Sequence, residues 1–180
     1  MLSGLVLAGG KSSRMQQDKA LLDFHGVTLL EHTQRQLFDA GCHAIMISRN
    51  QDGCIKDMVA NAGPLGGIHA ALHHARDDDA LLVMPVDMPF VSIELLQTLI
   101  ETGFDSERPC YFDDCYLPLY LPVSDKARRF LDKLLASDGQ GRVRQLLNYL
   151  DAIVLPIADR TPLRNLNTPA DWQQALTSTE

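Results

Sequence analysis

Short, almost wholly apolar runs alternate along the chain with segments in which apolar residues recur at helical spacing. Continuous apolar runs are typical of strands that are buried on both faces of a parallel sheet. Helical spacing over ten or more residues is typical of amphipathic helices that cover such a sheet. The alternation therefore predicts a three-layer α/β fold with a mostly parallel sheet, formed by residues 1–180 as a single domain. The predicted strands are 2–8, 44–48, 80–86, 116–121 and 153–157, and the predicted helices are 29–40, 64–75, 92–100, 124–136, 142–150 and one that starts near 169.

Residues that favour helix ends stand at several of these boundaries. Gly41 follows the first predicted helix and suits its C-terminal end, where a residue in the left-handed conformation commonly terminates a helix. Ser92 and Thr168 precede two other predicted helices, and their hydroxyl oxygens can accept a hydrogen bond from the first turn. His25 and Gly26 predict a turn after a short apolar piece at 20–24.

Composition and charge narrow the classes of protein to which the chain can belong. Its 180 residues are 46% hydrophobic and carry a net charge of −7, which suits a globular domain and argues against a general nucleic-acid binder. Every apolar run is too short for a signal peptide or a membrane span, so we expect a cytoplasmic protein with no membrane partner. The cysteines are irregularly spaced, which favours buried reduced thiols over a zinc site. They are Cys42, Cys54, Cys110 and Cys115.

A glycine pair at the end of the first predicted strand is the strongest signal for a binding site. Gly9 and Gly10 follow the apolar run directly, and Lys11, Arg14 and Lys19 follow within the next nine residues. Glycines let backbone N–H groups approach phosphate oxygens, and the cations neutralise the phosphate charge. Because ligands of open α/β sheets bind at the carboxyl ends of the strands, the pattern predicts a phosphate-binding loop. A flexible basic loop without a ligand is the alternative for this segment alone.

Two better-known phosphate-binding motifs do not fit this segment. The residues Gly10-Lys11-Ser12 match the end of a P-loop, but that motif requires a glycine at the position of Leu5. The dinucleotide-binding pattern G-x-G-x-x-G fails because the two glycines here are adjacent. The loop therefore belongs neither to an ordinary ATPase nor to a dinucleotide-binding fold.

Asp87 directly follows the buried apolar run at 80–86. If this strand neighbours the first one, the carboxylate of Asp87 faces the cationic glycine loop. A carboxylate opposite a phosphate site is electrostatically unfavourable unless a divalent cation lies between them, and Mg²⁺ binds one or two carboxylates together with phosphate oxygens. The alternative is that Asp87 caps the helix that follows, with which Pro89 is compatible.

Two further clusters are less specific. The segment Gly63-Pro64-Leu65-Gly66-Gly67 could offer backbone groups to a ligand, or it could be a tight turn in which backbones pack closely, and both interpretations stay open. The acidic run at 77–79 is interpreted as a solvated loop rather than a metal site.

Four blocks of the chain, in the same order, resemble the molybdenum cofactor guanylyltransferase family of nucleotidyltransferases. They are the pattern L-A-G-G-x-S-x-R-M-x-x-D-K at 7–19, G-P-L-G-G at 63–67, V-D-M-P at 86–89 and N-L-N-T-P at 165–169. The resemblance implies a Rossmann-like nucleotidyltransferase fold and Mg²⁺ as the cofactor. It also implies transfer of GMP from GTP to the terminal phosphate of molybdopterin, with release of pyrophosphate, and proteins of molybdenum cofactor delivery as partners.

The resemblance implies catalytic roles for three residues. Lys19 would bind the phosphates and stabilise the transition state, Arg14 would lie beside it, and Asp87 would hold Mg²⁺. Positioning and charge stabilisation would supply most of the rate, so no histidine or cysteine is assigned a catalytic role.

Binding roles are implied for a larger set. The residues expected to contact the nucleotide are Leu7, Ala8, Gly9, Gly10, Lys19, Ser48 or Asn50, Asp57 and Asp87. The residues expected to face the pterin are Asn165 and Asn167.

One departure and two alternatives accompany the resemblance. Gln16 stands where the family usually has glycine, which costs about 1 kcal/mol if that backbone position has positive φ. The pair Gly9-Gly10 favours guanine, because relatives that use other bases often carry L-A-A-G. The nearest alternative is a cytidylyltransferase or sugar-phosphate nucleotidyltransferase of the same fold, and the second is a non-catalytic nucleotide-binding module.

Overall fold

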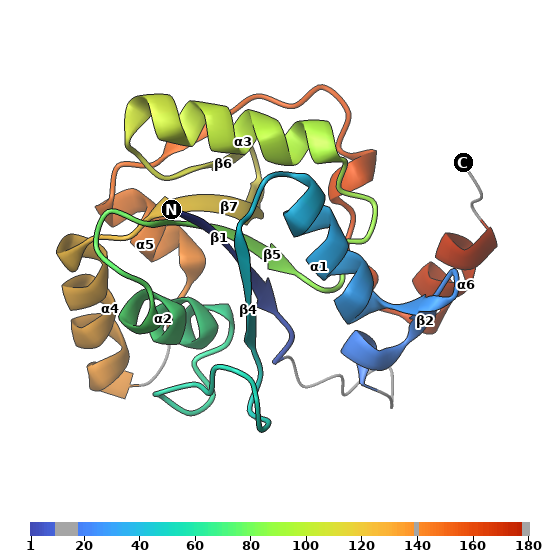
Figure 1. Ribbon diagram of the computed structural model, residues 1–180, viewed down its shortest axis with the longest axis horizontal. Helices are drawn as coiled ribbons and strands as arrows, with labels where there is room; N and C mark the ends of the chain where they lie inside the picture. The colour runs from blue at the N-terminus through green and yellow to red at the C-terminus, as the bar shows by residue number, and fades with distance from the viewer. Residues whose placement is uncertain (10–17, 139–140, 178–180) are drawn as a thin grey trace.

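The computed structural model of the chain describes residues 1–9, 18–138 and 141–177. Its centre is a six-stranded sheet with the order β4-β1-β5-β7-β6-β8, and helices cover both faces of that sheet (Figure 1). This is the three-layer α/β fold that the alternation of apolar runs predicts. The strands of the sheet are β1 (Leu2–Leu7), β4 (Ala44–Ser48), β5 (Ala80–Pro85), β6 (Cys110–Phe112), β7 (Cys115–Pro122) and β8 (Ile153–Leu155).

The helices follow the strands in the predicted order. They are α1 (Leu29–Asp39), α2 (Pro64–His74), α3 (Ile93–Ser106), α4 (Asp125–Asp138), α5 (Val143–Tyr149) and α6 (Pro169–Thr177). Two short 3-10 helices, η1 (Lys19–Leu21) and η2 (Thr161–Leu163), and a hairpin of β2 (Asp23–Phe24) and β3 (Val27–Thr28) complete the described elements. None of the helices in these described ranges is long and apolar enough to cross a membrane.

The sheet is mostly parallel, and its register aligns three strand ends. β1 lies between β4 and β5 and pairs in parallel with both, and Leu7 is opposite Ser48 on one side and Pro85 on the other. The chain therefore leaves all three strands at the same edge of the sheet. β7 runs antiparallel to β5 and to β6, whereas β8 is parallel to β6.

Alternate residues of the central strands face two separate apolar layers. Leu5 and Val83 pack with residues of α2, α4 and α5, and Val6 and Met84 pack with residues of α1 and α3. Because successive side chains of a strand point to opposite faces, a strand buried on both sides must be apolar throughout. This is why the runs at β1 and β5 lack the polar alternation of a surface strand.

A smaller apolar cluster packs the last helix against the β2–β3 hairpin, beside the main sheet. Phe24 of the β2–β3 hairpin packs with Leu166 and with Ala175 of α6, and the ring of Trp172 lies 6.0 Å from the ring of Phe24. Figure 1 shows α6 beside β2 at one end of the molecule. The residues that lead into α6 pass close to the end of β5, since the N–H of Leu166 donates a hydrogen bond to the carbonyl of Asp87.

The predicted boundaries are confirmed at several helix ends. The hydroxyl of Ser92 accepts a hydrogen bond from the N–H of Leu95, and the hydroxyl of Thr168 accepts one from the N–H of Asp171. Gly41 has φ of +114° directly after the end of α1, as its C-terminal position predicts.

Other expectations require correction. β6 was not predicted, because three residues between Pro109 and an acidic turn are too few to show a period. α3 continues to Ser106 rather than ending near residue 100, since Gly103 packs inside the helix against Tyr120 and the left-handed residue that ends the helix is Glu107. All four cysteines are free thiols, but only Cys42 and Cys110 are buried, while Cys54 and Cys115 are partly exposed. The prediction that the acidic run at 77–79 is a loop is confirmed, and Asp77 in this loop pairs with Arg128 of α4.

Candidate functional site

A cavity of about 220 Å³ lies at the edge where β1, β4 and β5 end. The residues that follow these strands form its floor, and η1 and the start of α2 form its walls. It is lined by Leu7, Ala8, Gly9, Asp18, Lys19, Ala20, Ser48, Asp57, Gly63, Pro64, Pro85, Val86, Asp87 and Leu117. Seven residues expected to contact a nucleotide therefore share one cavity: Leu7, Ala8, Gly9, Lys19, Ser48, Asp57 and Asp87.

Lys19 connects the cavity to the segment that precedes α6. Its Nζ lies 3.4 Å from Asp87 Oδ2 and donates a hydrogen bond of 3.0 Å to Asn167 Oδ1. The side chains of Lys19 and Asp87 are only 17% and 19% exposed, so the ammonium group is largely withdrawn from solvent. Three segments that are far apart in the sequence thus converge on one cation.

Asp87 occupies the turn that follows β5 and does not cap the next helix. The N-cap of α3 is Ser92, and the backbone of Asp87 instead accepts a hydrogen bond of 2.8 Å from the N–H of Leu166. Its Oδ1 atom is buried and has no hydrogen-bond partner within the described ranges. A buried carboxylate oxygen without a partner is costly, and a bound cation is one group that would satisfy it.

The position of Lys19 is fixed by a partly buried ion pair. Asp18 is the N-cap of η1, and its Oδ1 accepts a hydrogen bond of 3.1 Å from the N–H of Ala20. Its other oxygen pairs with the guanidinium of Arg49, a residue that is 6% exposed. Arg49 directly follows β4, so this pair ties the segment with Lys19 to the end of a central strand.

Asn50 and Asp57 hold each other on the loop after β4. The side-chain oxygen of Asn50 accepts a hydrogen bond of 2.9 Å from the N–H of Asp57, and its amide nitrogen donates one of 3.3 Å to Asp57 Oδ2. Asp57 lines the cavity and Asn50 does not. Asn50 therefore orients Asp57, while Ser48 reaches the cavity at the end of β4.

The glycines of the second block allow α2 to approach the strands closely. A Cβ atom on Gly67 would come within 2.3 Å of Ser48 Oγ and 2.8 Å of Leu7 Cδ2. Gly63, with φ of +59°, and Pro64 begin α2 at the cavity wall. The close-packing interpretation of this block therefore holds for Gly67, and the positive end of the α2 dipole faces the cavity.

The structure separates the two asparagines of the last block. Asn167 contacts Lys19 through its side-chain oxygen, and its own N–H is bound by Asp171 at 3.0 Å. Asn165 is exposed and does not line the cavity. Gly10, Lys11, Arg14 and Gln16 lie outside the described residues.

Sequence reasoning assigned no role to Arg49 or Asp18, although both act on the cavity. Arg49 directly follows the second predicted strand, and this position at a strand end could have indicated a role at the binding edge of the sheet. Asp18 belongs to the D-K pair of the opening pattern. Its partner lies 31 residues away, and no local pattern predicts such a pair.

The chain is similar to known proteins over most of its length. Residues 4–153 match the family described as the MobA-like NTP transferase domain. The chain is 38% identical over 179 residues to a molybdenum cofactor guanylyltransferase of Xanthomonas euvesicatoria pv. vesicatoria (strain 85-10), and the alignment covers 97% of this chain and 94% of that relative.

Two solved structures share the fold. A molybdopterin-guanine dinucleotide biosynthesis protein A from Archaeoglobus fulgidus superposes with a TM-score of 0.79 at 23% identity and covers 96% of each chain. A Mycobacterium tuberculosis protein in complex with manganese superposes with a TM-score of 0.69 at 22% identity and covers 99% of each chain. The arrangement of sheet and helices is therefore similar over nearly the full length of the described fold.

Proposed function

The chain belongs to the family of MobA-like NTP transferase domains, and we propose that it transfers GMP from GTP to the terminal phosphate of molybdopterin. The similarity to a molybdenum cofactor guanylyltransferase over 97% of the chain supports this choice of substrates. It also supports the treatment of residues 1–180 as a single nucleotidyltransferase domain. The observation that carries the proposal is the convergence of Lys19, Asp87 and Asn167 at the cavity beyond β1 and β5.

The reaction exchanges one phosphoanhydride bond for another. An oxygen of the terminal phosphate of molybdopterin attacks the α-phosphorus of GTP, and the bond from that phosphorus to the bridging oxygen of the β-phosphate breaks. Pyrophosphate leaves and carries away the electron pair of the broken bond. No covalent intermediate with the protein is required, so the side chains contribute positioning and charge stabilisation.

Lys19 stabilises the negative charge that increases on the phosphate oxygens as pyrophosphate departs. Its ammonium is held by Asp87 and Asn167 in a largely desolvated position, where an electrostatic interaction is stronger than in water. Asp18 and Arg49 fix the start of η1 and so position Lys19. Arg14 is proposed to act beside Lys19.

A divalent cation, which we propose is Mg²⁺, would be held by Asp87. The unpartnered Oδ1 atom of Asp87 and the further carboxylate of Asp57 in the cavity wall fit an ion that prefers oxygen ligands. When bound, such an ion supplies positive charge to the phosphate oxygens. The manganese complex of a protein with the same fold is compatible with a divalent cation.

The remaining contacts divide between the two substrates. The guanine nucleotide is proposed to meet Leu7, Ala8, Gly9 and Gly10 at the end of β1, with Ser48 and Asp57 beside them. The pterin is proposed to approach from the side of Asn167, with Asn165 farther out on the exposed part of the same segment. Proteins that deliver the molybdenum cofactor are proposed as partners of the chain.

A product assay tests the choice of base and acceptor. The purified full-length protein is incubated with Mg²⁺, molybdopterin and each of GTP, CTP, ATP and UTP, and the products are identified by mass spectrometry. We expect the guanine dinucleotide and one equivalent of pyrophosphate with GTP. A cytosine dinucleotide formed at an equal or higher rate would overturn the guanine assignment in favour of a cytidylyltransferase.

A matched pair of variants tests the cation site. Asp87→Asn keeps the shape of the side chain but removes its charge, so it should raise the Mg²⁺ concentration needed for half-maximal rate by about tenfold or more. Asp52→Asn removes a fully exposed carboxylate on the loop after β4 and should leave the Mg²⁺ response unchanged.

Absence of product with every nucleotide in the wild-type protein would favour the non-catalytic alternative.

A further inference from the structure

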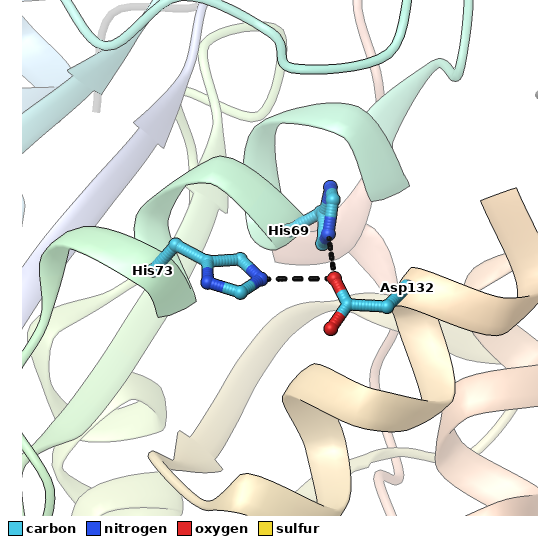
Figure 2. Close-up of side chains that lie close together, drawn as sticks. All are labelled: His69, His73 and Asp132. Carbon is cyan, nitrogen blue, oxygen red and sulfur yellow. Dashed lines mark hydrogen bonds and ion pairs between the residues drawn. The ribbon is translucent and has the colours of Figure 1, made fainter. Parts of the chain in front are cut away.

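Two histidines of α2 and an aspartate of α4 converge where these two helices pack against each other. His69 Nε2 lies 2.7 Å from Asp132 Oδ1, and His73 Nε2 lies 3.0 Å from the same oxygen (Figure 2). The two rings stand nearly perpendicular, at 89°, with centroids 4.9 Å apart. The three ligand-type atoms all lie within 4.8 Å of one another, which is close enough for one small ion to contact all three.

The spacing of the two histidines on α2 explains their convergence. Residues four apart on a helix lie on the same face, one turn above the other, and two histidines at this spacing are a common zinc-binding pair. His69 is 4% exposed and belongs to the interface of α2 with α4, whereas His73 and Asp132 are 32% and 48% exposed. The cluster therefore has a buried inner side and an outer side that an ion can reach from solvent.

Arg128 fixes the two helices relative to each other. Its guanidinium donates hydrogen bonds to the carbonyl oxygens of Leu72 and Ala75, at the C-terminal end of α2. Arg128 stands four residues before Asp132 on α4, so the same contact holds Asp132 opposite the histidines. The three side chains are thus preorganised by helix packing, and binding an ion would require little movement of the backbone.

We propose that His69, His73 and Asp132 form a binding site for a transition-metal ion of the Zn²⁺ class, separate from the cation site at Asp87. Imidazole nitrogen and a single carboxylate suit Zn²⁺, Co²⁺ or Ni²⁺, whereas Mg²⁺ prefers oxygen ligands throughout. Solvent would complete the coordination on the exposed side. The ion would connect α2 to α4 and stabilise the helix whose N-terminus borders the cavity.

The surroundings of His69 limit the expected affinity. Ligation through Nε2 puts the ring proton on Nδ1, and Nδ1 of His69 is buried with no acceptor among the residues that the structure describes. A hydrogen bond from the outer nitrogen of a ligating histidine typically improves metal affinity by about 10–100-fold. We therefore expect tighter binding than at scattered surface histidines and weaker binding than at a structural zinc site with four protein ligands.

Titration of the full-length protein tests the site. The protein is treated with EDTA, dialysed into buffer with excess Mg²⁺, and titrated with ZnCl₂ by calorimetry as wild type, His73→Asn, Asp132→Asn and His74→Asn. His74 is the matched control, because it lies on the same helix but its Nδ1 contacts the carbonyl of Ala70 instead of the cluster. We expect one Zn²⁺ per chain, a loss of affinity of about tenfold or more in the two cluster variants, and none in His74→Asn.

Two further measurements separate metal binding at the cluster from misfolding of the variants and from binding at a cysteine. Circular dichroism in EDTA checks that the variants are folded. We expect them to fold, because His73 and Asp132 are both partly exposed. The absorption spectrum of the Co²⁺ form should lack a thiolate charge-transfer band, because no cysteine belongs to the cluster. Equal Zn²⁺ affinity in all four proteins, or a thiolate band in the Co²⁺ spectrum, would overturn the proposal and leave the cluster as a hydrogen-bonded contact between α2 and α4.

Discussion

At the scale of single residues, the position of Lys19 depends on neighbours from distant parts of the chain. Asp87 and Asn167 contact its ammonium group, and Asp18, the preceding residue, is bound by Arg49. Asp87 follows β5 and Arg49 follows β4, whereas Asn167 belongs to the segment before α6. A side chain held by several groups loses little further freedom on binding a phosphate, so the charge of Lys19 is preorganised for its proposed role in catalysis.

Lys19→Ala should therefore reduce turnover by about 10²–10³-fold, the usual effect of removing one preorganised charge from a transition state. The loss should exceed anything caused by unfolding, since a typical domain of this size stays folded after a change of about one or two kcal/mol. Steady-state formation of the dinucleotide, measured beside urea unfolding of the same variant, separates the two effects.

The matched control is Lys56→Ala. Lys56 forms an ion pair with Asp52 on the loop after β4, and both side chains are largely exposed. An exposed pair of this kind contributes little to stability and nothing to a reaction in the cavity, so wild-type turnover is expected. Wild-type turnover in Lys19→Ala as well would show that the reacting phosphates bind elsewhere.

At the scale of elements, the approach of α2 to the strand ends determines the depth of the cavity. Gly67 faces Ser48 and Leu7, with no room for a side chain between the helix and the strands. Glycine is a poor helix former, costing about 0.5–1 kcal/mol relative to alanine inside a helix. Its presence in α2 is explained by this close contact rather than by helix propensity.

Gly67→Ala should lower the free energy of unfolding by about 1–3 kcal/mol, because the new Cβ would come within 2.3 Å of Ser48 Oγ and force α2 outward. Gly66→Ala is the comparison, since its Cβ would meet the Ala62 and Asp57 side chains at 3.1 and 3.3 Å. That milder crowding is offset by better helix propensity, so we expect a smaller change. Urea unfolding measures both, and an equal effect of the two substitutions would contradict the close contact as the reason for glycine at this position.

The elements of the fold were largely predictable, and the reasons are local. β1 and β5 are continuous apolar runs, and α1 carries a clear helical period with Gly41 at its end. Each of these elements could therefore be predicted from a short stretch of the sequence. β6 could not be predicted because its three residues are too few to show a period, and one of its two partner strands, β8, lies about 40 residues further along the sequence. The hairpin of β2 and β3 was seen only as a turn at His25-Gly26.

The location of the cavity was predictable, because it lies at the ends of neighbouring parallel strands. Gly9 and Asp87 follow two apolar runs, and neighbouring parallel strands bring their ends together, as observed. The ion pair of Asp18 with Arg49 and the contact of Asn167 with Lys19 join segments that are 31 and 148 residues apart. Such pairs arise from the tertiary fold, and no periodicity or motif in a single sequence encodes them.

At the scale of the whole molecule, the sheet separates two apolar layers that fold as parts of one structure. One layer contains α2, α4 and α5, with the histidine cluster on its outer side, and the other contains α1 and α3. The second layer includes Cys42, which is 2% exposed, and Cys110, whose Sγ contacts the carbonyl of Leu99. These two thiols therefore report on whether α1 and α3 stay packed against the sheet.

Burial raises the pKa of the Cys42 and Cys110 thiols to about 12. Because the folded pKa is raised, the protonated thiols stabilise the folded protein fully below the unfolded pKa of about 8.5, and this contribution is lost as the pH rises toward about 12. Iodoacetamide reacts with the thiolate form of cysteine. For a thiol with a pKa of about 12, only about 10⁻⁴ of the molecules carry the thiolate at about pH 8. Chemistry and access therefore both protect these two residues in the folded protein.

Alkylation at about pH 8, followed by mass spectrometry of peptides, should label the partly exposed Cys54 first. Cys42 and Cys110 should be labelled only when the whole protein unfolds, so their labelling rates should depend on urea in the same way as global unfolding. Both rates should rise together, because both residues lie in the layer that α1 and α3 cover. Cys115 is the internal comparison, since it is partly exposed but its pKa is also raised by burial, so its rate should fall between the two groups. Labelling of Cys110 without urea at the rate of Cys54 would show that α3 opens independently of the sheet, and the molecule would then not unfold as a single cooperative unit.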